Sequence, residues 1–380
     1  MMDAAASGCR ALTGGTVQLH SGVCDMFTQL LTIARNTFTE SIRQPIFAVL
    51  VLLGGVAMVL NVAWAANTLE NDTKMMMDLS LSVMLLVGLL LAAFAATSVL
   101  TQEIENRTVL TVVSKPVSRP VFIVGKYLGV VGALALAFFV LGIVFLLTCR
   151  HGVLQTASDQ LDGPVVVFGL GAALVALSVS AVGNYLYNWV FSSTLVATMA
   201  ATGSLALLLV LLIDKQWAFQ NPLSTVFAQD VPMSQLLIGL LLIFQTLLIL
   251  TAVALAASTR LGQIMTLLVS FGVFIVGLAS SAFSGLVSMR VNIPDGTSGL
   301  GSLWAIIGSD TAIHLKLIYV LSQVFYLVLP NLDFLWIADA INTGQIVTLS
   351  HVGWLTVYSL LYVVVVLAMA VVLFQRREVG

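Results

Sequence analysis

Apolar runs of about 20 residues recur along the chain, which is the length a helix needs to cross the hydrocarbon core of a bilayer. Of the 380 residues, 59% are hydrophobic and only 8% are charged, whereas soluble domains carry about 25% charged residues. The sequence therefore predicts an all-α polytopic membrane protein with about eight spans. We place these spans at residues 46–66, 79–100, 121–148, 165–187, 192–213, 235–257, 262–285 and 352–374.

The distribution of basic residues predicts the orientation of these spans. An even number of spans puts both termini on one side of the membrane, and cytoplasmic segments carry an excess of Lys and Arg. With cytoplasmic termini, the cytoplasmic segments hold ten of these residues and the outer segments hold five. We therefore expect both termini to be cytoplasmic.

Two regions leave the span count open. The fourth and fifth runs are separated only by GNYLYNWVFSS (183–193), and if they formed one broken or re-entrant pair, a six-span core would remain. The segment 312–329 is short and carries His314 and Lys316, so we interpret it as an amphipathic outer-surface or re-entrant helix. The alternative is a ninth span, which would place the C-terminus outside.

The eight runs carry no ionisable residue near their middle. A charge there costs at least about 2.5–3.5 kcal/mol and is usually retained for ion, proton or substrate movement. The chain also lacks the patterns H-E-x-x-H, G-x-S-x-G and G-x-x-x-x-G-K-S/T, and its three cysteines show no paired spacing. We predict no catalytic residue, metal site or cofactor in this chain, so any uphill transport would need energy from a partner.

A few polar residues interrupt the runs. Asn61 and Gln245 favour hydrogen bonds between helices, which are common in membrane bundles. Asn184 and Tyr185 have the same interpretation, and they are also the candidates for a substrate path.

The segment DMFTQLLTIARNTFTESIRQP (25–45) predicts an amphipathic helix that ends before Pro45. Its opposite side is polar and partly basic, as in helices that lie in a membrane interface. A helix packed on a partner has the same pattern, and the two interpretations are compatible. The apolar stripe consists of Phe27, Leu30, Leu31, Ala34, Phe38 and Ile42.

Charges gather in TQEIENRTVLTVVSKPVSRPVFIVGK (101–126). The first half is compatible with a short helix that continues from the second span and ends at Pro116. Ser118 can cap the next helix, and Pro120 suits its first turn. This cytoplasmic helix–turn–helix has two interpretations, a docking surface or an ordinary loop whose charges pair with one another. The charged residues are Glu103, Glu105, Arg107, Lys115, Arg119 and Lys126.

These features together resemble the permease subunits of type-2 ABC exporters. The resemblance lies in the helix TIARNTFTESIRQP, followed by two spans and by E-x-E-x-R-T-V-L-T-V-V-S-K-P-V-S-R-P-x-F-x-x-G-K between Glu103 and Lys126. The C-terminal VLPNLDFLWIADAIN and the final span ending in FQRREVG are also similar to that family. The nearest groups are the permeases for maturation of multi-copper enzymes and the gliding-motility permeases.

The resemblance implies a type-2 ABC exporter transmembrane fold, with a six-span core plus an extra pair. It makes 101–120 a cytoplasmic coupling segment seated on a separate ATPase subunit, and it makes 25–43 an elbow helix. ATP and magnesium would bind in the ATPase. The implied assembly has two ATPase copies and a second permease, as a homodimer in a bacterial inner membrane. The implied ATPase-coupling residues are Glu103, Glu105, Arg107, Lys115 and Arg119.

The expected organisation has four parts: a cytoplasmic N-terminus with the elbow helix (1–45), a transmembrane bundle (46–285), an outer loop (286–351), and a last span with a basic tail (352–380). The leading hypothesis is a non-catalytic permease subunit of an ATP-driven exporter, surrounded by lipid and without a nucleic-acid partner. One alternative is a mechanotransmitting subunit that acts on a periplasmic partner. Another is a secondary carrier or channel, which the empty span centres disfavour.

Overall fold

The computed structural model describes residues 17–66, 72–105, 118–154, 161–221, 233–291, 313–336 and 347–375. Within these ranges the chain is helical apart from its connections, and Ile213 and Phe219 form an isolated β-bridge. Eight described helices are long and apolar enough to cross a membrane, which confirms the prediction of a helical multi-pass protein. They are α3 (Pro45–Ala65), α4 (Asp72–Glu105), α6 (Arg119–His151), α7 (Gly163–Tyr187), α8 (Phe191–Leu212), α10 (Met233–Ser258), α11 (Gln263–Val291) and α15 (Leu349–Gln375).

Most helix ends lie within a few residues of their predicted positions. The amphipathic helix predicted at 25–43 is α2 (Val17–Arg43), which begins eight residues earlier. The helix α3 begins at Pro45, one residue before the predicted span, because proline needs no hydrogen-bond partner in a first turn. The second span was predicted to begin at residue 79, but α4 begins at Asp72. The early turns of α4 are stabilised by burial of Met76 and Met77.

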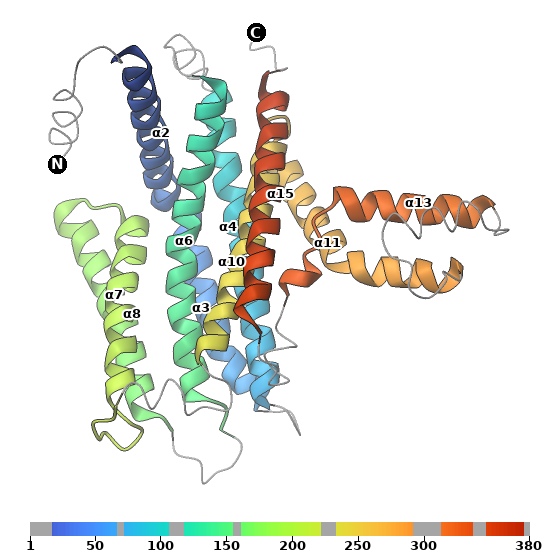
Figure 1. Cartoon of the computed structure of the whole chain (residues 1–380). Helices are drawn as coiled ribbons and strands as arrows, with labels where there is room; N and C mark the ends of the chain where they lie inside the picture. The colour runs from blue at the N-terminus through green and yellow to red at the C-terminus, as the bar shows by residue number, and fades with distance from the viewer. Residues whose placement is uncertain are drawn as a thin grey trace.

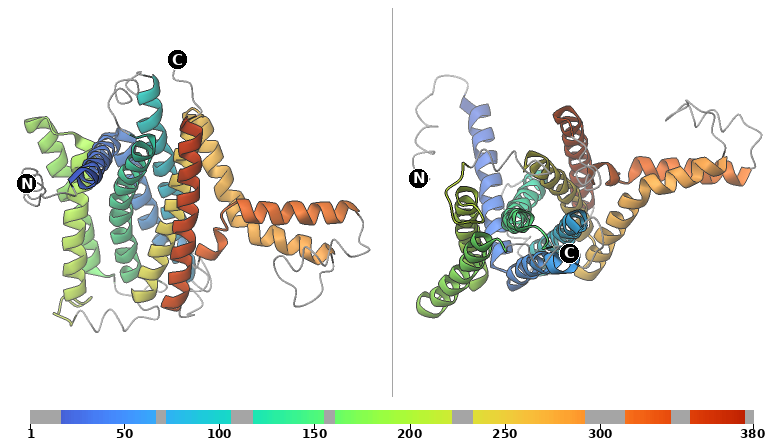
Figure 2. Two further views of the ribbon diagram at one scale, coloured as in Figure 1. Left: turned by 45° about the horizontal axis from the view of Figure 1, so that its top comes forward. Right: turned by 90° about the horizontal axis from the view of Figure 1, so that it is seen from below.

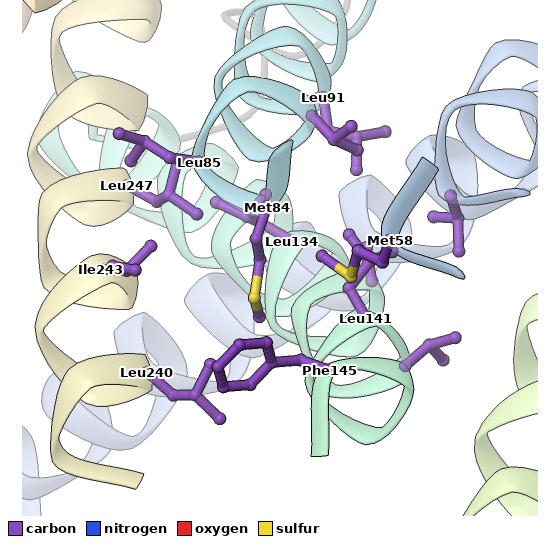
Figure 3. Close-up of a cluster of buried hydrophobic side chains, with 14 of the residues drawn as sticks. Met58, Met84, Leu85, Leu91, Leu134, Leu141, Phe145, Leu240, Ile243 and Leu247 are labelled. Atoms are coloured by element: carbon purple, nitrogen blue, oxygen red, sulfur yellow. The ribbon is translucent and has the colours of Figure 1, made fainter. Parts of the chain in front are cut away.

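The core lies between α3, α4, α6 and α10. The apolar stretches of α4, α6 and α10 are 67%, 61% and 67% buried, against 28% for α3, so these three helices form the centre of the bundle. Met58, Met84, Phe145 and Leu247 point toward one another from the four helices (Figure 3). The centre is apolar, which agrees with the absence of charges in the middle of the runs.

The chain enters and leaves the bundle at the same end. The end of α15 lies at the top of Figure 1, and we call this the N/C end; α3 begins lower, where the inclined helix α2 ends, in the same half of the bundle. The end of α4, the start of α6 and the turn between α10 and α11 lie there as well (Figure 1). An even number of crossings produces this arrangement.

The helices α7 and α8 form an antiparallel hairpin beside the bundle (Figure 1). They have 25 and 22 residues, so each is long enough to cross a membrane by itself, which favours two separate spans over one broken or re-entrant pair. Their apolar stretches are only 17% and 22% buried. The hairpin is therefore an extra pair attached to the outside of a six-helix bundle.

The second half of α11 and the helix α13 (Ile313–Val328) leave the bundle sideways as an antiparallel pair (Figures 1 and 2). The helix predicted at 312–329 is thus present, and its 16 residues are too few for a ninth span. At the base of this pair, the amide of Leu332 donates to the carbonyl of Gly277 at 3.1 Å. A Cβ at Gly277 would lie 2.7 Å from the carbonyl oxygen of Pro330, so only glycine permits this approach.

Candidate functional site

The segment 101–120 connects α4 and α6 at the N/C end. Because α4 continues to Glu105, the helix extends beyond the second apolar run as predicted, and Glu103 and Glu105 lie in its last turn. The side chains of these two glutamates, together with Arg107, Lys115 and the rest of 106–117, lie outside the described part of the chain. The grouping of these charges as a docking surface therefore stays a prediction.

The start of α6 agrees with the predicted positions of Ser118 and Pro120. Ser118 is the N-cap residue, with extended backbone angles (φ −68°, ψ 137°), and a proline lies in the first turn. The predicted side-chain cap is wrong, because the Ser118 hydroxyl makes no hydrogen bond to the described first turn. The extended backbone and the proline ring suffice to start the helix, and the carbonyl of Ser118 accepts from the amide of Phe122 at 3.1 Å.

Arg119 contacts its own chain. Its Nη1 donates to the carbonyl of Gln375 at 3.1 Å, and Nε of Arg260, in the turn after α10, donates to the carbonyl of Leu373 at 3.1 Å. Both carbonyls belong to the last turn of α15, where carbonyls lack intrahelical partners and the helix dipole is negative. The start of α6 and the turn after α10 are thus both hydrogen-bonded to the end of α15.

A buried aromatic pair lies beside these arginines. The rings of Phe122 and Phe374 stack with centroids 5.7 Å apart, and both side chains are buried. The hydroxyl of Tyr127 donates to the carbonyl of Leu248, which adds a contact between α6 and α10. We call the set Arg119, Phe122, Arg260 and Phe374, with the last turn of α15, the α15-end junction.

Lys126 is a buried cation that the sequence interpretation left without a role. Its side chain is 2% exposed, and Nζ lies 5.6 Å from the centroid of the Phe122 ring. Ionisable residues buried in membrane helices are costly, and an aromatic ring stabilises a desolvated cation. Its position directly after Gly125 in an apolar run was the signal for this burial.

The helix α2 packs along α6 and is strongly inclined to the bundle axis (Figures 1 and 2). Three glycines of α6 form the contact surface: Cβ atoms at Gly125, Gly129 and Gly132 would lie 2.9, 2.5 and 3.3 Å from atoms of α2. Glycines at such spacing let membrane helices approach closely. We call this contact the α2–α6 seam.

The buried face of α2 differs from the predicted apolar stripe. Phe27 and Leu31 are 61% and 53% exposed, whereas Thr37 and Ser41 are fully buried. Ile42 is buried as the stripe predicted, and the stripe residues Leu30, Ala34 and Phe38 are partly buried. The glycines leave room for Ile33, Thr37 and Phe38 of α2 to approach α6, and the Ser41 hydroxyl donates to the carbonyl of Thr37 at 2.9 Å. The exposed Phe27 and Leu31 remain available to the membrane interface.

The end of α2 is fixed to two other elements. The hydroxyl of Ser192, at the start of α8, lies 2.8 Å from the carbonyl oxygens of both Ile42 and Gln44. Nε2 of Gln44 donates to the hydroxyl of Ser98 on α4 at 2.6 Å. The junction of α2 and α3 is therefore held by the hairpin on one side and by the core on the other.

The structure places Asn184 and Tyr185 near the turn between α7 and α8. Nδ2 of Asn184 donates to the carbonyl of Trp189 at 2.7 Å, which closes the turn, and Tyr185 is 86% exposed. The rings of Tyr187 and Trp189 stack beside them, and such aromatic residues are enriched at membrane interfaces. Neither candidate is buried in the bundle, so their role in a substrate path stays a prediction.

Gln245 makes the interhelical hydrogen bonds that its position predicted. Its Nε2 donates to the hydroxyl of Thr356 at 2.7 Å, and the Ser359 hydroxyl lies 3.5 Å from its Oε1. These bonds join the middle of α10 to the first half of α15. For Asn61, by contrast, Nδ2 has no hydrogen-bond partner among the described residues.

An ion-pair cluster at the opposite end of the bundle was not predicted. Arg150, near the end of α6, lies 3.6 Å from Asp162 and 3.5 Å from Asp214. Asp162 is fully buried and accepts from the amide of Val165 at the start of α7. The three residues come from separate connections of the chain, so no local sequence pattern shows that they meet. They hold the hairpin on α6.

The described residues contain no group of three or more His, Cys, Asp or Glu side chains placed to hold a metal ion. The features of the N/C end are hydrogen bonds, ring contacts and close packing that link helices, and these can transmit movement. No protein-family model matches the chain, and no curated protein sequence matches it. The family resemblance therefore rests on the motifs alone.

Proposed function

We propose that the chain is the transmembrane subunit of an ATP-driven exporter of the type-2 ABC class. A separate ATPase subunit docks on 101–120 and moves the bundle. The observation that carries this proposal is the place of the charged segment, which joins α4 and α6, two of the three most buried helices. A force applied at this segment acts directly on the core.

The proposal also accounts for the apolar centre of the bundle. Ion-coupled carriers depend on ionisable groups deep in the membrane, whereas the centre between α3, α4, α6 and α10 is formed by apolar side chains (Figure 3). Energy then comes from a partner that binds ATP and magnesium. In the proposed assembly, two ATPase subunits act on a permease homodimer in a bacterial inner membrane, with both termini in the cytoplasm.

The docking role is tested by reversing both charges at the end of α4 with Glu103→Lys and Glu105→Lys. We expect this variant to insert normally and to lose the ATPase on purification, because both residues lie beyond the apolar run of α4. The matched control is Asp295→Lys with Asp310→Lys in the predicted outer segment, which should keep the ATPase. Normal ATPase binding by the Glu103/Glu105 variant would favour the ordinary-loop interpretation.

A second candidate function is mechanical action on a periplasmic partner. The pair formed by α11 and α13 favours it, since it projects sideways from the bundle and could carry movement to another protein (Figures 1 and 2). This function predicts that Asn184→Ala and Tyr185→Ala leave activity unchanged, because no substrate crosses the bundle. A secondary carrier or channel, the third alternative, predicts transport without any ATPase.

A further inference from the structure

Two arginines that lie far apart in the sequence bind the same helix end. Arg119 is the first residue of α6, directly after the connection from α4, and Arg260 lies in the turn between α10 and α11. Each donates to a carbonyl of the last turn of α15 at 3.1 Å. Hydrogen bonds from a charged donor are stronger than neutral ones, and at a helix C-terminus the dipole adds to the attraction.

The buried ring pair makes this contact resistant to sliding. Phe122 follows Arg119 by one turn of α6, and Phe374 lies between the two carbonyls that accept from the arginines. A shift of α15 relative to α6 would break the hydrogen bond from Arg119 to Gln375. The same shift would separate the stacked, buried rings of Phe122 and Phe374. The start of α6 and the end of α15 therefore move as one unit.

The helix α10 belongs to the same unit. Gln245, in the middle of α10, donates to Thr356 in the first half of α15, and Arg260, in the turn after α10, donates to the end of α15. Movement that reaches the end of α15 through Arg119 is thus shared with α10. Arg119 is the hydrogen-bonding link between the charged segment and this pair of helices.

We propose that Arg119 is a positioning residue that passes movement of 101–120 to the end of α15, and that Arg260 holds the α10–α11 turn on the same helix end. This inference rests on the proposed function, because the segment moves under an ATPase only if one docks there. It gives Arg119 a role different from the ATPase contact that the resemblance implies.

The two roles of Arg119 predict different results for the same variants. If Arg119 contacts the ATPase, Arg119→Ala weakens ATPase binding. If it positions α15, the ATPase stays bound and α15 no longer responds to nucleotide. Arg119→Lys keeps a charged donor near the helix end and should preserve much of the response, which a general loss of folding would not. Arg119 is exposed, so its replacement leaves the core intact.

The test uses the permease–ATPase complex in lipid nanodiscs, with Cys9, Cys24 and Cys149 replaced by serine. Val372→Cys, on the half-exposed side of α15, reports movement through its labelling rate with a water-soluble thiol reagent. We expect nucleotide trapping to change this rate in the background protein and in Arg119→Lys. We expect Arg119→Ala to lose the change while keeping the ATPase, and Arg260→Ala to reduce it.

Three results would overturn the inference: loss of the ATPase from Arg119→Ala, a full nucleotide response in Arg119→Ala, or no response at Val372→Cys in the background protein. Failure of the proposed function is a separate result, in which no ATPase accompanies the background protein at all.

Discussion

The α2–α6 seam makes Gly129→Ala the most informative single substitution. A Cβ at Gly129 would lie 2.5 Å from Cβ of Thr37 and 2.6 Å from the carbonyl oxygen of Ala34. Carbon atoms normally approach to about 3.5 Å, so the two helices must separate by about 1 Å. Because one of the neighbouring atoms is backbone, a side-chain rotation cannot relieve the contact.

The cost follows from two opposing terms. Overpacking of this kind costs about 1–3 kcal/mol, and a shift as large as this one belongs at the upper end of that range. Replacing glycine by alanine inside a helix stabilises the helix by about 1 kcal/mol. We therefore expect Gly129→Ala to lower the free energy of unfolding by about 2 kcal/mol.

The neighbouring glycines provide a graded series. A Cβ at Gly125 would lie 2.9 Å from Cγ2 of Ile33, and a Cβ at Gly132 would lie 3.3 Å from the ring of Phe38. Both contacts are longer than the one at Gly129, so the costs of Gly125→Ala and Gly132→Ala should be smaller. Gly171→Ala is the matched control, since no heavy atom lies within 4 Å of its Cβ position. Melting temperatures in detergent should fall in the order Gly129, Gly125, Gly132. If Gly129→Ala melts like Gly171→Ala, the close approach of α2 and α6 is refuted.

Two further substitutions test the contacts between helices. Gln245→Leu should lose the bond to Thr356 and destabilise the protein by about 0.6–1.7 kcal/mol, measured by denaturation in mixed micelles; an unchanged midpoint would contradict the bond between α10 and α15. Arg150→Leu leaves Asp162 buried without its cation, so it should cost about 3 kcal/mol or more, whereas Asp214→Asn, at a half-exposed carboxylate, should cost less than about 1 kcal/mol. Equal melting temperatures for these two variants would show that burial of Asp162 does not matter.

The number and order of the spans could be predicted because apolar length is a local property of the sequence. The boundary between α2 and α3 could be predicted for the same reason, because Pro45 ends the helix before it and suits the first turn of the next one. The helix at 312–329 was also visible in its local pattern, although its sideways course depends on the contact of Gly277 with the backbone at Pro330.

The buried face of α2 could be predicted only in part from hydrophobicity: Ile42 is buried as expected, but Thr37 and Ser41 are buried as well. The stripe places Phe27 and Leu31 on the buried side, yet both are exposed, and the polar Thr37 is buried where Gly129 lets the two helices approach. The spacing of Gly125 and Gly129 was a usable signal that the apolar pattern of α2 obscured.

The α15-end junction could not be predicted for a different reason. Arg119 and Arg260 bind main-chain carbonyls, and every residue has one, so the sequence of α15 does not mark the accepting positions. The charges near 101–126 identified the region, but the partner of Arg119 depends on where α15 ends in space.

The central claim is that a separate ATPase drives this chain, and it is tested most directly by purifying the tagged protein from native membranes in mild detergent. Mass spectrometry then identifies the proteins that accompany it. We predict recovery of a subunit that carries the nucleotide-binding pattern G-x-x-x-x-G-K-S/T, lost when Glu103 and Glu105 are both reversed. Recovery of the chain alone, from a preparation that keeps other membrane complexes intact, would contradict the claim and favour a carrier or a structural subunit.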